Sequence, residues 1–203
     1  ALEKFSTGFY IDFPDLKNQL KRNYKSLQIL NNPNHKRHHL YLIGSLMNNA
    51  YRRAEEGKYD DAIARLYRSI ELISQIGLEK YDIDPYNVDL DRIEADSPEM
   101  ARNLKPKLTK GYDDKYKFIS LDARFLLLYN ISKFNEIAVE YFNNRTKFNN
   151  LLHSRNNSII AHGSDVKTFE DYENFKNSVL DLFKLLTEDY KQILDATSFP
   201  QFK

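Results

Sequence analysis

Residues 153–163 read HSRNNSIIAHG, in which Arg155 precedes His162 by seven positions. On a helix, seven steps of about 100° return a side chain to nearly the same face, roughly 10 Å further along the axis. A guanidinium and an imidazole at that separation could hold a phosphodiester between them. Ser158 is predicted to share their face, and Asn156 follows Arg155 directly.

Metal-free cleavage of RNA is one reaction that such a pair could carry out. It needs a group that deprotonates the ribose 2′-hydroxyl, a group that protonates the leaving 5′-oxygen, and positive charge beside the phosphoryl oxygens. Histidine suits the proton transfers and arginine suits the charge, above all if a two-fold axis supplies a second pair. The alternative is a solvated Arg155 and a His162 favoured by the dipole of a helix C-terminus. Two asparagines in mid-helix after Arg155 are unfavourable for stability and favour the functional interpretation.

The composition limits what surrounds this pair. The 203 residues carry 30 basic and 29 acidic side chains, a net charge of +1, so any phosphate-binding surface must be local. The absence of cysteine excludes disulfides and thiolate metal sites and fits a cytoplasmic protein. No apolar run reaches the length of a membrane span, so no membrane partner is expected.

Apolar residues recur at three- to four-residue spacing, which predicts an all-α fold. We expect one helical domain over 1–203, with an N-terminal helical extension at 1–36 and an irregular insertion at about 78–118 containing at most one short helix. Gly57 should end the second helix and Gly77 the third, which begins at about Tyr59. The expected helices cover residues 14–30, 37–56, 59–77, 120–144, 145–162 and, as one long helix, 168–196.

Two segments resemble HEPN domains. The string SRNNSIIAHG is similar to their R-x(4–6)-H signature, and KYDDAIARLYRSIEL resembles a helix of the HEPN domain in CRISPR-associated CARF–HEPN ribonucleases. The resemblance implies a HEPN-type helical bundle that cleaves single-stranded RNA without metal or cofactor, as a homodimer whose two motifs form one site. It implies that Arg155 and His162 are the catalytic pair and that Asn156 fills the polar position. The products would be a 2′,3′-cyclic phosphate and a 5′-hydroxyl.

The family's CARF sensor has no counterpart in this sequence, which contains neither alternating strands nor a Gly-rich turn. A sensor domain and a cyclic oligoadenylate activator are therefore expected only if a longer chain exists. Two other functions remain open, a HEPN module that binds RNA or nucleotide without cutting, and a structural helical dimerisation domain.

Two weaker groups could contact RNA. His38 and His39, with His35, lie in NHKRHH, which is interpreted as a solvated helix start, an RNA-contacting patch or a metal site without a third ligand. Arg65 and Arg68 lie three apart and could bind phosphate beside an aromatic ring, or could pair with nearby carboxylates. No metal site is predicted. The Asp-rich stretch DIDPYNVDLDRIEAD lacks the central glycine and ligand spacing of a calcium loop.

Overall fold

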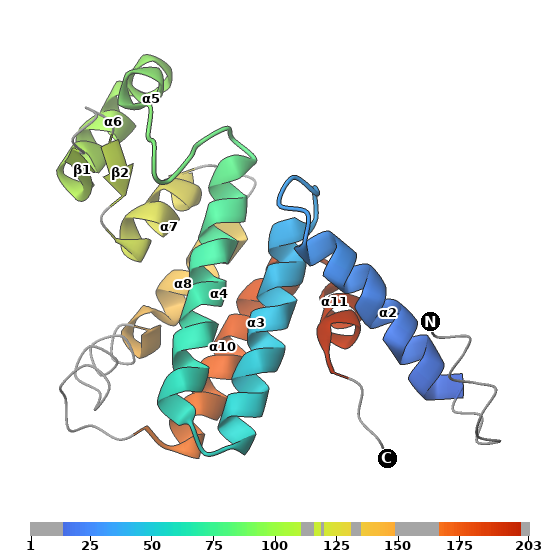
Figure 1. The fold of residues 1–203 in the computed structure, drawn as a ribbon. Coiled ribbons are helices and arrows are strands. Elements are labelled where there is room, and N and C mark those ends of the chain that lie inside the picture. The colour runs from blue at the N-terminus through green and yellow to red at the C-terminus, as the bar shows by residue number, and fades with distance from the viewer. Residues whose placement is uncertain (1–13, 111–115, 119, 131–134, 149–166, 200–203) are drawn as a thin grey trace.

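The computed structural model describes residues 14–110, 116–118, 120–130, 135–148 and 167–199 (Figure 1). Within these ranges the chain is almost entirely helical, which confirms the predicted all-α class. None of the described helices is both long and apolar enough to cross a bilayer. The elements, in chain order, are α2 (Pro14–Leu30), α3 (His38–Glu55), α4 (Tyr59–Glu79), α5 (Leu90–Asp96), α6 (Pro98–Leu104), a 3-10 turn (Lys105–Lys107), β1 (Leu108–Lys110), β2 (Tyr116–Phe118), α7 (Leu121–Asn130), α8 (Asn135–Asn143), α10 (Phe169–Leu186) and α11 (Tyr190–Thr197).

Helix α4 lies at the centre of the bundle. It packs against α3, α10 and α7, and Figure 1 shows α3 and α4 side by side with α10 behind them. An apolar stripe of α4 faces this core, since Ala62, Ile63, Leu66, Ile70 and Ile73 are all buried. The tight connection between α3 and α4 depends on Gly57, whose φ of 72° favours glycine.

Gly77 does not end α4, and that prediction was wrong. The helix continues to Glu79, and a Cβ atom at Gly77 would lie only 2.9 Å from Cδ2 of Leu128 on α7. The glycine is therefore a place of close helix approach, where the missing side chain makes room for a neighbouring leucine.

The expected single helix over 168–196 is also wrong, because α10 ends at Leu186 and α11 begins at Tyr190. Thr187 is extended, with φ −156°, and its hydroxyl donates to Asp189 at 2.5 Å. Asp189 also pairs with Arg37, at the start of α3. These contacts fix a bend that turns the chain back, so that α11 packs on α3 and α2.

The insertion at 78–118 contains more regular structure than one short helix. It holds α5, α6 and an antiparallel pair in which Leu108 faces Phe118 and Lys110 faces Tyr116. The pair joins the rest of the insertion through the N–H of Val88, which donates to the carbonyl of Tyr116 at 2.6 Å. Short strands without a long alternating pattern give little periodicity signal, which explains the missed prediction.

Helices α2 and α11 come from opposite ends of the chain and pack against each other. Side chains of α2 and α3 donate to carbonyl groups at the end of α11, and so replace the helical hydrogen bonds that those groups lack. Ser26 donates to Ala196 at 2.7 Å, Asn23 to Ser198 at 2.6 Å, and Asn48 to Leu194 at 2.8 Å. The N-terminal helix is thus joined to the bundle through α11 as well as directly through α3.

The α3–α11 contact gives a stability prediction. A Cβ atom at Gly44 would lie 2.8 Å from both Cγ2 of Ile193 and Oγ1 of Thr197. Gly44→Leu should lower the free energy of unfolding by roughly 2 kcal/mol, because overpacking forces the two helices apart. Urea denaturation followed by circular dichroism measures the change. The matched control, Glu55→Leu at an exposed position of the same helix, should change stability by less than about 0.5 kcal/mol. A Gly44→Leu protein as stable as the parent would contradict the close approach.

Candidate functional site

The predicted catalytic segment lies outside the described residues. This holds for Arg155, Asn156, Ser158 and His162, all of which fall within residues 149–166. The structure does describe the two points between which the segment is attached, namely helical residues 145–148 on one side and Lys167 with Thr168 on the other. The contacts of these two attachments determine where the candidate site is joined to the helical bundle.

The first attachment is an aromatic stack that ends at Phe148, which is fully buried. Its ring lies 5.3 Å from that of Tyr141 on α8 and 5.6 Å from that of Phe175 on α10. Tyr141 in turn stacks on Phe125 of α7, with ring centroids 3.9 Å apart. Buried aromatic rings contribute large apolar area, so Phe148, which precedes the predicted catalytic segment, is held against α8 and α10 and, through Tyr141, against α7.

Asp122, at the start of α7, strengthens this attachment through a polar contact. Its Oδ1 accepts from the hydroxyl of Tyr141 at 2.7 Å, and its Oδ2 accepts from Nε and Nη2 of Arg145 at 2.9 and 2.6 Å. We call Asp122, Tyr141 and Arg145 the Asp122 tether. Burial, together with the hydrogen bond to Asp122, raises the pKa of Tyr141 far above its usual value, so the phenol stays a donor.

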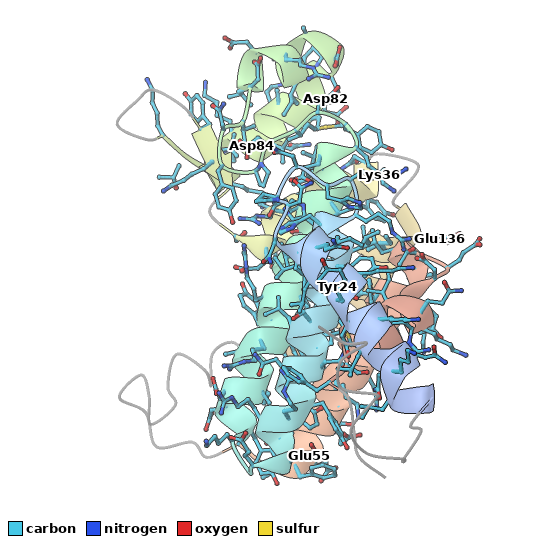
Figure 2. All side chains as sticks on the ribbon, turned by 45° about the vertical axis from the view of Figure 1, so that its right-hand side comes forward. Tyr24, Lys36, Glu55, Asp82, Asp84 and Glu136 are labelled. Atoms are coloured by element: carbon cyan, nitrogen blue, oxygen red, sulfur yellow. The ribbon has the colours of Figure 1, made fainter. Side chains whose placement is uncertain are left out.

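The second attachment is the N-terminus of α10. The side chain of Thr168 accepts from the N–H of Asp171 at 3.2 Å, while Oδ2 of Asp171 accepts from the N–H of Thr168 at 2.9 Å. This reciprocal capping box fixes where the helix begins. Phe169 then contacts Tyr59 at the start of α4, with centroids 6.1 Å apart. Helix α10, which follows the predicted catalytic segment in the chain, thus begins at the end of the bundle where α3 ends and α4 begins, the end marked by Glu55 in Figure 2.

Arg65 and Arg68 each pair with a carboxylate of α4, and whether they contact RNA stays a prediction. Nη1 of Arg65 donates to the carbonyl of Asp61 at 2.8 Å and pairs with the carboxylate of the same residue. Nη1 of Arg68 pairs with Glu71 at 2.8 Å, which is one of the pairings considered from the sequence. Each guanidinium is therefore partly neutralised on its own helix.

The histidines around the start of α3 have local partners. Nδ1 of His35 accepts from the N–H of Arg37 at 3.1 Å, Nδ1 of His38 lies 3.3 Å from the carbonyl of Ile29, and Nδ1 of His39 lies 3.1 Å from Glu79. These contacts favour the helix-start interpretation of the three over the metal site. Whether His38 and His39 also contact RNA stays a prediction.

The acidic stretch of the insertion supplies caps and turns. Oδ1 of Asp84 accepts from the N–H of Tyr86 at 2.8 Å, and Oδ1 of Asp89 accepts from the N–H of Arg92 at 2.9 Å at the start of α5. Figure 2 shows Asp82 and Asp84 at the end of the bundle opposite Glu55. Within the described ranges, no three His, Asp or Glu side chains converge as a metal site would require.

Sequence reasoning missed two charged residues of α7, Asp122 and Arg124. Arg124 is buried beside Ala123 and Phe125, in the segment LDARFLLLYN. The available signal was its place among apolar residues, since a charged side chain within a core helix needs a partner. For Asp122 no such signal existed, because its partners lie 19 and 23 positions away.

The comparison with protein families identifies the wider group. The chain matches the sequence model for the Csm6 HEPN domain over residues 31–186, a range that extends from just before α3 to the end of α10 and includes the segment with Arg155 and His162. Searches of the curated proteins and of the solved structures found no significant match. Because the matched range covers more than half of the sequence, the chain belongs to the Csm6 HEPN domain family.

Proposed function

We propose that this protein is an endoribonuclease that cleaves single-stranded RNA without a metal ion, through Arg155 and His162. Membership of the Csm6 HEPN domain family supports, in general terms, a ribonuclease module linked to CRISPR. The observation that carries the finer proposal is the position of the R-x6-H segment inside the matched range. Arg155 would bind the phosphate and stabilise its developing charge, His162 would transfer protons, and Asn156 would supply the adjacent polar group.

The proposed active form is a homodimer in which two copies of the segment share one site. A single segment offers one histidine in the motif, whereas the reaction requires both removal and delivery of a proton. A two-fold axis would supply the second imidazole and a second guanidinium without any further residue. The two attachments at Phe148 and Thr168 support this arrangement, because they would present the segment of each copy in a defined position.

The catalytic pair gives the most direct test. Arg155→Ala and His162→Ala should each lower the cleavage rate of a labelled single-stranded RNA in EDTA by about 10²- to 10⁴-fold, as expected for loss of proton transfer or phosphoryl charge stabilisation. The products should carry a 2′,3′-cyclic phosphate and a 5′-hydroxyl, which mass spectrometry identifies. The matched control is Arg102→Ala, at an exposed position of α6, which should cleave at the parent rate. Equal rates in all four proteins would contradict the assignment and leave a binding or structural module.

A shared site predicts that activity depends on association. The cleavage rate per chain should fall as the protein is diluted below the concentration at which the dimer dissociates, because a single copy lacks half of the site. Analytical ultracentrifugation over the same concentrations measures the dimer fraction. A rate per chain that stays constant while the dimer dissociates would show that one copy is sufficient.

The Asp122 tether gives a second prediction for activity. Asp122→Ala leaves the buried hydroxyl of Tyr141 without its acceptor, and should lower the free energy of unfolding by about 1–3 kcal/mol. It should also slow RNA cleavage several-fold at a temperature where the protein is still folded, because the segment after Phe148 is less well positioned. Asp181→Ala, which removes an exposed pair with Lys184, is the control and should cost less than about 0.5 kcal/mol. Lost stability with an unchanged cleavage rate would mean that the tether is structural only.

A further inference from the structure

The guanidinium of Arg124 is buried without a carboxylate among the described residues. Its side chain is 8% exposed, and its Nε and Nη1 atoms have no hydrogen-bond acceptor. A buried charge of this kind is costly unless a counter-charge or several acceptors compensate it. The two N–H groups without an acceptor could therefore bind an anion.

Two further side chains meet Arg124 there. The ring of Tyr86, in the turn before α5, lies over the guanidinium with 5.1 Å between Cζ and the ring centroid. Arg68 of α4 approaches the same phenol and holds Glu71 at 2.8 Å. Burial raises the pKa of Tyr86, but hydrogen bonding with Arg68 and Arg124 and their charges outweigh this effect, so its pKa lies below the usual value. Two guanidiniums thus favour negative charge on one oxygen.

The phenol is a poor partner for two cations, because at neutral pH it offers one uncharged oxygen where ten guanidinium N–H groups are present. Arg68 and Arg124 together carry two positive charges. Glu71 neutralises one of them by pairing with Arg68, so one positive charge remains. A phosphate would supply a negative charge and several acceptor oxygens in the geometry that guanidinium groups bind best. A phosphate is therefore a better partner for the guanidiniums of Arg68 and Arg124 than the phenol of Tyr86.

Access to this position lies through Tyr86. That side chain is 51% exposed, and that of Arg68 is 43% exposed, so only Arg124 is enclosed. Rotation of Tyr86 about its side-chain torsions into solvent would remove its ring from the Arg124 guanidinium. The uncovered aromatic ring would then be free to stack on a base.

We propose that Arg68, Arg124 and Tyr86 form a binding site for a phosphate group of a nucleotide or RNA, in which a phosphate oxygen replaces the phenol oxygen between the two guanidiniums. The site is distinct from the R-x6-H segment and does not depend on the proposed cleavage reaction. It lies on α7 two residues from Asp122, whose carboxylate holds Arg145 at the attachment of that segment. A phosphate bound here would therefore contact the element that supports the predicted catalytic residues.

Thermal unfolding with inorganic phosphate tests the site. At about ten times the dissociation constant, phosphate should raise the Tm of the parent by about 3–6 °C relative to sodium chloride of equal ionic strength. Arg124→Met should abolish this shift. Without phosphate, Arg124→Met should be at least as stable as the parent, because a similarly shaped apolar side chain removes the cost of an unpaired charge. The matched control, Arg102→Met on the exposed face of α6, should keep the full shift.

Two further arms identify the source of the phosphate. Adenosine monophosphate replaces inorganic phosphate in the same unfolding assay, and a labelled single-stranded RNA is followed by fluorescence anisotropy in a His162→Ala background. If RNA is the ligand, Arg124→Met should weaken RNA binding about 10-fold or more, as expected for loss of a charge-assisted contact. If a free nucleotide is the ligand, adenosine monophosphate should raise the Tm of the parent and not that of Arg124→Met, while both proteins should bind RNA equally.

Either pattern supports the site. The proposal would be overturned if Arg124→Met and the parent showed the same Tm shifts and the same RNA affinity, or if neither protein responded to any ligand. If Arg124→Met without phosphate is less stable than the parent or does not fold, Arg68→Gln is the test, since its exposed side chain allows replacement without a buried cavity. Arg68→Gln should bind phosphate several-fold more weakly than the parent, and parent-like binding would reject the site.

Discussion

The structure depends on the burial of one helix, α4, against α3, α10 and α7. The hydrophobic effect is non-directional, so burial on several sides needs a helix whose apolar residues cover more than one narrow stripe. Leu66, Ile70 and Ile73 supply the central part of that surface, and Gly77 allows Leu128 of α7 to approach closely near the C-terminal end. Because α7 carries Asp122 and α10 carries Phe175, the same burial sets the position of the residues that hold the proposed catalytic segment.

The described residues on both sides of the segment with Arg155 and His162 are held by contacts with the helical bundle. Phe148 closes an aromatic stack, and Thr168 opens α10 through a capping box. A catalytic group must be held within a fraction of an ångström of its working position, which favours fixed attachment points near it. The Asp122 tether adds a charged hydrogen bond at the first of these points, where apolar contacts alone would not fix the direction of the chain.

How far the sequence predicts this fold depends on the range of the interactions involved. The helices expected over 14–30, 37–56 and 59–77 follow from the local 3.6-residue period, and the structure confirms them to within two residues at each end. Gly77 was misassigned because a helix stop and a site of close packing require the same residue, and only the distant Leu128 distinguishes them. The bend before α11 depends on Arg37, far away in the chain, so no local pattern marks it. The Arg155–His162 segment was predicted from its motif and lies outside the described residues, so its geometry stays a prediction.

The distribution of charge explains why a net charge of +1 is compatible with phosphate binding. Arg22, Arg37 and Arg145 each contact a carboxylate, and a close ion pair produces little field beyond a screening length of about 8 Å in physiological salt. Such pairs stabilise contacts between elements without attracting a polyanion over distance. Arg124 differs because the ring of Tyr86, and no carboxylate of the described residues, lies against its guanidinium, and because its burial limits screening by solvent. A protein with balanced composition can therefore place its effective positive charge at a few enclosed positions, where it acts on a phosphate that is already close.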